Sequence, residues 1–401
     1  RNSLIDPSYL SNWVVYDSPQ RLAQLRGIWH RVESDPAFSK AGRNSLGHTE
    51  RYTDACRKVV HFSKLVQAVQ LERRKPALSL DEVYDLYLAV DENIPLDVHL
   101  SMFIPLMRYH TSAEQRACWL GPALKFHIIG AYAQTELAHG SNVRGIQTTA
   151  TYKAPATEAD GDGCFEVHSP TLSALKWWPG GLGHTCTHAV VYAQLIIPSS
   201  KSDKKYGVHA FLVPLRDART HQPLPGIECG DIGPKFGYNA MDNGYARFTK
   251  VQVPRFNMLA GFAQVARDGS YARQEGAEKV AYGIMLDVRV RIVANSGYVL
   301  ARALTISLRY SFVRQQGSVS GNGEVSVIQY PTQQRMLLPL LSLAFGLHFI
   351  GQAMRNQYAA YAASAYPTGD DSYSSFVHGD EPAATATAEQ MLPMLHMRSA
   401  C

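Results

Sequence analysis

The sequence predicts an α+β protein made of three successive domains. A chain of 401 residues is too long for one compact core, which favours two or three domains. Apolar residues recur at helical spacing over residues 1–131, alternate in short runs over 132–275, and return to helical spacing over 276–401. Helices, then strands, then helices predict an α–β–α order and argue against a parallel sheet of the dinucleotide-binding kind.

The amino-terminal domain, residues 1–131, is predicted to be helical. Apolar residues three and four positions apart predict helices over Arg21–Glu33, Glu50–Glu72 and Leu80–Ala89. Ser112 is followed three residues later by Gln115, which fits a capping box: each side chain accepts a hydrogen bond from the other residue's backbone N–H. We therefore expect another helix running toward Leu124.

The middle domain, residues 132–275, is predicted to be a β-structure. Short runs rich in Val, Ile, Thr, Tyr and Phe are bounded by Gly, Pro, Asp or Ser, and their spacing predicts an antiparallel sheet or barrel. The expected strands are Gly145–Tyr152, Cys164–His168, His188–Ile197, Val208–Pro214 and Tyr245–Val253. Residues 159–163, with the sequence Ala-Asp-Gly-Asp-Gly, are predicted to form a turn between the first two strands.

The carboxy-terminal domain, residues 276–401, is predicted to begin with two long helices. They cover Val280–Arg314 and Pro331–Ala363 and are joined by a Gly- and Ser-rich loop, with a second loop at Pro367–Glu381 and a third helix at Ala383–Cys401. The run Met336–Ala353 is apolar enough to suggest a membrane span. Its internal Pro339, His348 and Gln352 favour a buried bundle helix instead, so no membrane association is predicted.

Composition narrows the class of partner. A hydrophobic content of 46% and a charged content of 18% are typical of a soluble globular protein. A net charge of +5 suits an anionic ligand, although so small an excess is also common on solvated surfaces. The densest basic run, Glu72–Lys75, is short and not interleaved with aromatics, so nucleic-acid binding is not predicted. The 6 cysteines contain no CxxC pair, which predicts reduced thiols in an intracellular protein.

Residues 184–188 contain side chains of the types that bind zinc. At strand spacing His184, Cys186 and His188 would share one face, but a closed zinc site needs a fourth ligand and none has suitable spacing. We therefore predict no metal. The sequence also contains no GxSxG elbow, phosphate-binding P-loop or strand-linked GxGxxG, which argues against hydrolases, nucleotidases and nicotinamide enzymes.

Two stretches carry the strongest functional signal. Residues 134–145 have the sequence Gln-Thr-Glu-Leu-Ala-His-Gly-Ser-Asn-Val-Arg-Gly, and residues 176–183 have Lys-Trp-Trp-Pro-Gly-Gly-Leu-Gly. Both combine a hydroxyl or a glycine backbone with flat apolar surface, which suits a planar ring with a polar edge. Together with the tract Gly226–Gly244, they resemble the flavin-contacting segments and signature strings of peroxisomal acyl-CoA oxidases, members of the acyl-CoA dehydrogenase superfamily. The resemblance runs from about Arg21 to about Ala400.

The resemblance implies an acyl-CoA dehydrogenase-like fold with FAD as cofactor. That fold has an amino-terminal helical domain, a middle antiparallel β-barrel domain and a carboxy-terminal helical bundle, which is incomplete here. By motif match, Thr135 contacts the flavin, Gly180 contacts it through its backbone, Trp178 packs on it and Ser141 lies near a phosphate. The alternative interpretation is that Thr135 ends a helix and the glycines only turn the chain. Family members commonly have Gly where this chain has Ala138.

The superfamily also places an arginine where this chain has Arg314. There it reaches the pyrophosphate of a flavin held mainly by the partner subunit, a task suited to a planar guanidinium. This implies a homodimer for the full-length protein. The other interpretation is a solvated arginine near a helix end.

The implied reaction is desaturation of a fatty acyl-CoA to the trans-2-enoyl-CoA, with molecular oxygen reduced to hydrogen peroxide. In the family a glutamate in a Phe-Glu-Gly-Glu-Asn-like segment removes the α-proton. No such segment occurs here, so no catalytic residue is assigned in this chain; Glu324 and Glu389 are expected on solvated surfaces. We expect a fragment whose missing part contains the base.

Three functional hypotheses follow. The Trp-Trp-Pro-Gly-Gly string favours an acyl-CoA oxidase of peroxisomal fatty acid β-oxidation, although the chain carries no Ser-Lys-Leu-type targeting ending. The second hypothesis is an acyl-CoA dehydrogenase that passes electrons to a flavoprotein carrier. The third is a non-catalytic fragment that lacks the base.

Overall fold

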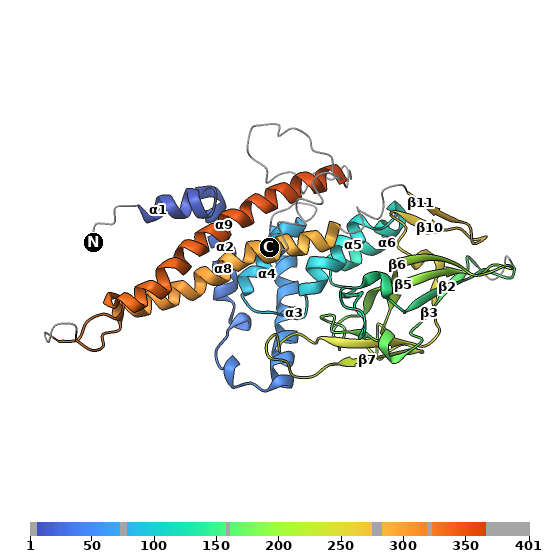
Figure 1. Ribbon diagram of the computed structural model, residues 1–401, viewed down its shortest axis with the longest axis horizontal. Coiled ribbons are helices and arrows are strands. Elements are labelled where there is room, and N and C mark those ends of the chain that lie inside the picture. The colour runs from blue at the N-terminus through green and yellow to red at the C-terminus, as the bar shows by residue number, and fades with distance from the viewer. Residues whose placement is uncertain (1–5, 73–77, 158–160, 275–282, 319–322, 366–401) are drawn as a thin grey trace. The chain divides into compact units, whose positions relative to one another are not determined.

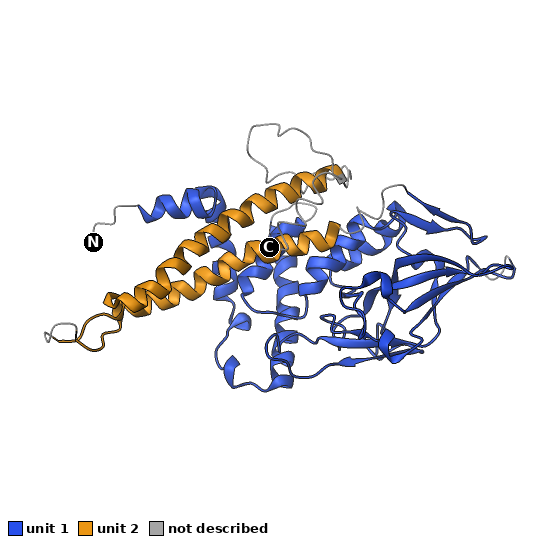
Figure 2. Ribbon diagram, in the orientation of Figure 1, with its two compact units in different colours: residues 1–277 blue, residues 278–401 orange. Residues whose placement is uncertain are grey.

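The computed structural model describes residues 6–72, 78–157, 161–274, 283–318 and 323–365 (Figure 1). The chain divides into two compact units, Arg1–Ala277 and Glu278–Cys401 (Figure 2). The predicted division of the first unit near residue 131 stays a prediction.

The first unit begins with helices close to the predicted ones. They are α1 (Pro7–Tyr9), α2 (Pro19–Ser34), α3 (His48–Glu72), α4 (Leu80–Val90), α5 (Ile104–Tyr109) and α6 (Ala113–Leu124), with π-helical turns at Leu10–Val15 and His99–Phe103. The capping box of Ser112 and Gln115 at the start of α6 is confirmed. A second box, which the sequence analysis did not identify, joins Ser79 and Glu82 at the start of α4.

The strands of the first unit follow. They are β1 (Gly130–Ala133), β2 (Thr149–Lys153), β3 (Cys164–His168), β4 (Lys176–Trp177), β5 (His188–Ile197), β6 (Lys204–Pro214), β7 (Ile227–Asp231), β8 (Gly244–Phe248), β9 (Val251–Pro254), β10 (Ala263–Val265) and β11 (Tyr271–Arg273). The predicted single strand Tyr245–Val253 is wrong. The extended conformation is interrupted at Lys250, whose φ of 52° is outside the extended region. Strands β8 and β9 therefore belong to different sheets.

Strand β5 lies at the centre of a six-stranded sheet. Strand β6 pairs with it antiparallel along one edge, while β1 and β2 follow one another along the other edge and run parallel to it. The expected antiparallel pairing therefore holds for the other described ladders but not for these two. The loop between β1 and β2 runs along the same edge of β5, so both strands point in the same direction as β5.

The two larger sheets share a core. Phe165, Val191 and Phe211 of the six-stranded sheet are fully buried together with Ala246 and Phe248 of the three-stranded sheet β4–β8–β7. Burying each large apolar side chain contributes about 1.5–3 kcal/mol. This shared core holds β4 against the larger sheet.

A buried histidine connects the helices to the first strand. The N–H of Gly130 donates to Nδ1 of His99 at 3.1 Å, and Nε2 of His99 lies 3.1 Å from the carbonyl of Ala123. Burial lowers the pKa of His99 to about 4, so the ring is neutral and Nε2 carries the proton that it donates. This anchors the start of β1 to the end of α6.

The second unit contains α8 (Gly283–Val313) and α9 (Pro331–Ala365), which pack along one another (Figure 2). The predicted loop Pro367–Glu381 and helix Ala383–Cys401 lie outside the described residues. By length and composition Pro331–Ser364 could cross a membrane, and 17% of its most apolar window is buried. The assignment of this helix to a bundle stays a prediction.

Glycine allows the close approach of α8 and α9. A Cβ on Gly351 would lie 2.7 Å from Cα of Ala294, whereas a Cβ on Gly346, in the same helix, would meet nothing within 4 Å. We expect Gly351→Ala to lower the free energy of unfolding by about 1–3 kcal/mol through overpacking. Gly346→Ala should instead raise it by about 0.5–1 kcal/mol through helix propensity. Urea unfolding of both variants tests this, and equal effects would contradict the close crossing.

Candidate functional site

Backbone pairing brings the two predicted motifs together. The N–H of Trp177 donates to the carbonyl oxygen of Thr135 at 3.1 Å, and Glu136 and Lys176 form an antiparallel bridge. Thr135 therefore lies beside β4, whose last residue, Trp177, precedes Gly180 by three positions. Since Thr135 follows strand β1, the interpretation that it ends a helix is wrong.

A buried ion pair lies directly behind this junction. Nζ of Lys176 is 3.2 Å from Oε1 of Glu136, and both side chains are fully buried. The ammonium also donates to the carbonyls of Gln134 at 3.1 Å and Tyr192, in β5, at 2.7 Å. Its three protons are thus all used. Lys176 joins the Thr135 turn, β4 and β5 through a single charged group.

The carboxylate of Glu136 holds the far end of the same turn. It accepts from the backbone N–H of Gln147 and of Thr148, both at 2.8 Å, and from the Thr148 hydroxyl at 2.6 Å. Burial alone would raise the pKa of Glu136, but the charge of Lys176 and these hydrogen bonds outweigh it and lower the pKa below its ordinary value. The ionised carboxylate of Glu136 therefore ties the two ends of residues 134–148 together.

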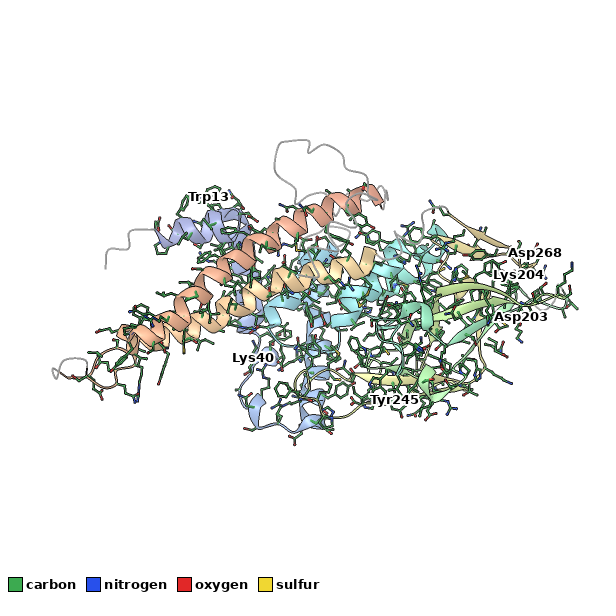
Figure 3. The ribbon with its side chains drawn as sticks, viewed as in Figure 1. Trp13, Lys40, Asp203, Lys204, Tyr245 and Asp268 are labelled. Atoms are coloured by element: carbon green, nitrogen blue, oxygen red, sulfur yellow. The ribbon has the colours of Figure 1, made fainter. Side chains whose placement is uncertain are left out.

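The second motif forms a strained corner after β4. Trp178 has a φ of +72°, which is unusual for a bulky side chain. Its N–H donates to the carbonyl of Gly244 at 2.8 Å, and Nδ2 of Asn243 donates to the Trp178 carbonyl at 2.7 Å. These bonds fix the Trp178 backbone, and its side chain is 52% exposed. The neighbouring Trp177 ring stacks instead on Tyr245, which is labelled in Figure 3.

Gly180 is crowded by protein atoms. A Cβ there would lie 3.1 Å from Sδ of Met241 and 3.1 Å from Cγ2 of Val98, which precedes the π-helical turn at residue 99. Gly181 follows with a φ of +79°, a conformation that favours glycine. The double glycine thus lets the chain turn in a tight space between the helices and the loop that contains Met241.

Two buried charged groups clamp the rest of the corner. The guanidinium of Arg216 donates to the carbonyls of Leu182, Gly183 and Cys186. The carboxylate of Asp242 accepts from the N–H groups of His184 and Thr185, each at 2.7 Å. Sequence reasoning missed both clamps because neither residue lies in a motif that predicts a loop contact. Asp242 falls within the Gly226–Gly244 tract, which was the available signal.

The remaining predicted residues are less closely connected to the corner. Ser141 is exposed in the loop that leads to β2. Ala138 is also exposed, with its N–H bonded to the carbonyl of Ser173 at 3.2 Å, so a methyl group in place of the usual glycine hydrogen is accommodated. Arg314 follows α8 in the second unit and is exposed. Its contact with the pyrophosphate of a flavin held mainly by a partner subunit stays a prediction.

The structure changes the interpretation of the histidine–cysteine segment. Only His188 lies in β5, while residues 184–187 belong to the corner and its exit, so the predicted common face is wrong. Cys186 is buried with its Sγ 3.6 Å from Nη1 of Arg216. Among the residues that the structure describes, no group of three or more His, Cys, Asp or Glu side chains could hold a metal ion.

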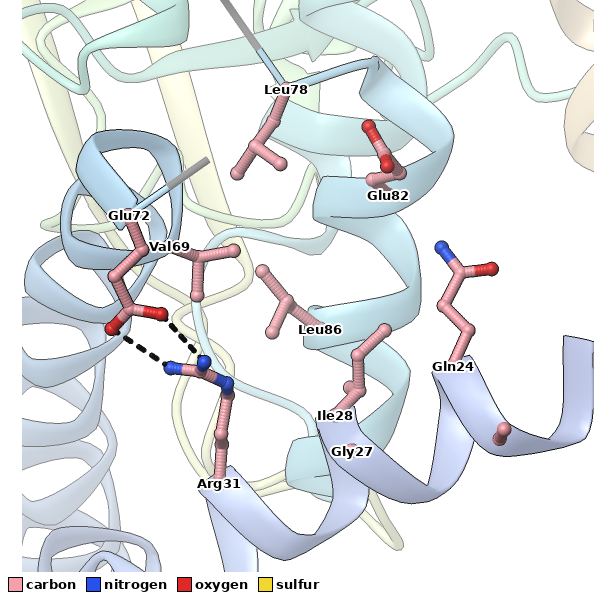
Figure 4. A pocket seen from close by; sticks show the side chains of 10 residues that line it. Gln24, Gly27, Ile28, Arg31, Val69, Glu72, Leu78, Glu82 and Leu86 are labelled. Carbon is pink, nitrogen blue, oxygen red and sulfur yellow. Dashed lines mark hydrogen bonds and ion pairs between the residues drawn. The ribbon is translucent and has the colours of Figure 1, made fainter. Parts of the chain in front are cut away.

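A separate cavity of about 220 Å³ lies among α2, α3 and α4 (Figure 4). Apolar side chains such as Ile28 and Leu86 form much of its lining, and none of the predicted flavin residues takes part. Its charged groups are already engaged. Arg31 pairs with both carboxylate oxygens of Glu72, and Glu82 caps the start of α4. Among the described residues that line the cavity, each charged group therefore already has a partner.

Family comparisons match almost the whole described chain. Residues 6–129 match the acyl-coenzyme A oxidase N-terminal model, residues 131–251 the acyl-CoA dehydrogenase middle domain, and residues 282–401 the acyl-CoA oxidase C-alpha1 domain. These three matches follow the family's domain order. The chain belongs to the acyl-CoA oxidase family, within the acyl-CoA dehydrogenase superfamily.

Individual relatives agree with this assignment. Peroxisomal acyl-coenzyme A oxidase 1 of Arabidopsis thaliana is 40% identical over 94% of this chain and 54% of its own length, and that of Rattus norvegicus is 40% identical over 86% and 50%. The chain therefore spans about half the length of the curated relatives it matches.

Solved structures share the fold. Arabidopsis thaliana acyl-CoA oxidase 1 has a TM-score of 0.78 at 40% identity, covering 90% of this chain and 53% of that one. Acyl-CoA oxidase-2 of Caenorhabditis elegans, solved with FAD, ascaroside-CoA and ATP, has a TM-score of 0.79 at 37% identity, covering 88% and 51%. The helical, β-rich and helical order predicted from the sequence is confirmed.

The lowered pKa of Glu136 makes stability depend on pH. Its folded pKa lies below the unfolded value of about 4.5, so its contribution is fully present above pH 4.5 and is lost as the pH falls through the folded pKa. We expect the free energy of unfolding to fall more steeply below pH 4.5 in the natural protein than in Glu136→Gln. Urea unfolding at a series of pH values measures this difference, and parallel curves would contradict the buried, ionised state of Glu136.

Proposed function

We propose that this chain is the flavin-binding part of an FAD-dependent acyl-CoA oxidase. The observation that carries the proposal is the hydrogen bond between Trp177 and Thr135, which joins the two motifs that the family uses at its flavin. A hydroxyl-bearing turn and a glycine corner then lie side by side on one junction.

The residues at this junction fit a planar ring with a polar edge. Trp178 presents a half-exposed indole from a strained backbone, a conformation that is common at ligand sites. Oδ1 of the neighbouring Asn243 is buried and has no hydrogen-bond partner among the described residues. Buried polar atoms are normally satisfied, so an orphaned acceptor here supports a ligand that brings a donor.

Each predicted residue has a role in this proposal. The Thr135 hydroxyl and the backbone of Gly180 hold the polar edge of the flavin, and Trp178 covers its face. Ser141 contacts a phosphate. Arg314 reaches the pyrophosphate of a flavin held mainly by a partner subunit, which makes the full-length protein a homodimer.

When bound, FAD would accept a hydride from the β-carbon of the substrate and pass the electrons to molecular oxygen. This chain orients the flavin and the fatty acyl-CoA. None of the described glutamates at the junction is free to act as the base, because both oxygens of Glu136 are occupied by donors. Removal of the α-proton is assigned to the glutamate of the family's Phe-Glu-Gly-Glu-Asn-like segment. That segment is not among these 401 residues.

The naming of the relatives as peroxisomal supports a peroxisomal location for this protein. The second candidate is an acyl-CoA dehydrogenase that uses a flavoprotein carrier. Dehydrogenases of the superfamily usually have a polar Thr-Asn-Gly turn after the tryptophan, and the Trp177–Gly181 string favours the oxidase. The third, a non-catalytic fragment, follows if the natural protein lacks the base.

The Thr135 hydroxyl should contribute directly to flavin binding. We expect Thr135→Val, which keeps the shape but removes the hydroxyl, to weaken FAD binding about fivefold, the equivalent of one hydrogen bond of about 1 kcal/mol. Thr151→Val in β2 serves as the matched control. Titration of the flavin-free chain with FAD, followed by flavin fluorescence, measures both. Equal affinity for the Thr135 variant and the natural chain would contradict the assigned contact.

Activity separates the three candidate functions. The full natural protein that contains this chain should form hydrogen peroxide when fatty acyl-CoA and oxygen are supplied. Reduction of an electron-carrier dye without peroxide would support the dehydrogenase. A protein that neither binds FAD nor turns over acyl-CoA would support the non-catalytic fragment.

A further inference from the structure

We propose that Glu136 and Lys176 are positioning residues of the flavin site, which lock the Thr135 turn and the Gly180 corner into one rigid wall. This inference rests on the proposed function, because it assigns the pair a role toward the flavin. Neither side chain is assigned a contact with the flavin itself. They act through Thr135 and Trp177, their immediate neighbours in the chain.

The pair connects two motifs that are far apart in sequence. Glu136 belongs to the first motif and Lys176 begins the second, and their charged groups meet 3.2 Å apart with no solvent exposure. Lys176 also donates to the carbonyl of Gln134, on the other side of Thr135. Thr135 is therefore held from both flanking residues by the same ammonium group.

Stability alone does not account for a buried pair of this kind. Replacing a buried ion pair by apolar residues of similar volume is often neutral or stabilising, since removing charges from water is costly. What such a pair does impose is geometry, because each charge must keep its partners in place. Here the partners are the carbonyls of Gln134 and Tyr192 and the N–H groups of Gln147 and Thr148, so the pair fixes the first motif, the start of β2 and β5 around Lys176 of the second motif.

The charge of Lys176 has a second consequence. Lys176→Met removes the ammonium from the Glu136 carboxylate beside Thr135, whose remaining contacts are the N–H groups of Gln147 and Thr148, the Thr148 hydroxyl and Nδ1 of His139 at 3.1 Å. A negative charge disfavours the more electron-rich, reduced form of a nearby flavin. Loss of the ammonium should therefore lower the flavin midpoint potential, whereas a purely structural loosening of the wall has no such directional effect.

The first experiment measures FAD affinity and midpoint potential in Lys176→Met, Glu136→Gln and the double variant Glu136→Leu/Lys176→Met. We expect each single variant to bind FAD at least tenfold more weakly. Lys176→Met should also lower the potential by about 30 mV, equal to a tenfold change in relative affinity for the two redox forms of a two-electron couple. The double variant should fold well but remain weak in FAD binding, because the hydrogen bonds that hold the Thr135 turn to β4 and β5 are lost.

Lys153→Met is the matched control. Lys153 lies in β2 of the same unit and pairs with Glu166 at 3.9 Å, but its side chain is 50% exposed. Removal of a lysine charge from this surface pair should leave FAD affinity and potential unchanged. A shift equal to that of Lys176→Met would show a general charge effect and overturn the inference.

A second measurement uses the flavin-free chain. Hydrogen exchange at the Trp177 amide reports the bond to Thr135, and we expect exchange at least tenfold faster in the double variant than in the natural chain. If the natural chain binds FAD and the folded double variant binds it equally well, the positioning role is wrong while the proposed function stands. If the natural chain binds no FAD, the proposed function fails and the positioning role fails with it.

Discussion

The buried contact between Glu136 and Lys176 is the constraint on which the functional junction depends. Away from water, each carboxylate oxygen and each ammonium proton needs a partner. The backbone of residues 134–148 and of Tyr192 in β5 supplies those partners. Removing one member of such a pair typically costs about 3–5 kcal/mol, because the other charge is left buried and alone. The turn at Thr135 and the start of the corner therefore keep their places together or lose them together.

The rest of the first unit supports this junction from both sides. His99 fixes the start of β1, which leads into the Thr135 turn, and Val98 packs against Gly180. Beyond the corner, Arg216 gathers carbonyl groups while Asp242 gathers N–H groups. Helical and β-rich parts of the first unit thus both shape the junction. Apart from Arg314, the residues predicted to contact the flavin lie in the β-rich part.

The sequence predicted most of the secondary structure because hydrophobic period and capping residues report local conformation directly. It did not predict that β1 and β2 run parallel to β5, since apolar alternation carries no information on strand direction. The break between β8 and β9 at Lys250 was missed because the apolar pattern continues across it. The motifs that contain Thr135 and Gly180 meet at the hydrogen bond between Trp177 and Thr135, while their contacts with a flavin stay predictions. Arg216 and Asp242 were missed, because a buried charge that binds mainly backbone groups leaves no spacing pattern in the sequence.

The central claim is that the Thr135 turn and the Gly180 corner form two halves of one flavin wall. Hydrogen exchange of the natural chain with and without FAD tests it most directly, because bound flavin should slow exchange wherever it covers or orders the backbone. We predict protection in residues 134–148 and 176–186 together, with the surface strand pair around Lys153 and Glu166 unchanged. Protection of only one of these segments, or of a different part of the chain, would contradict it.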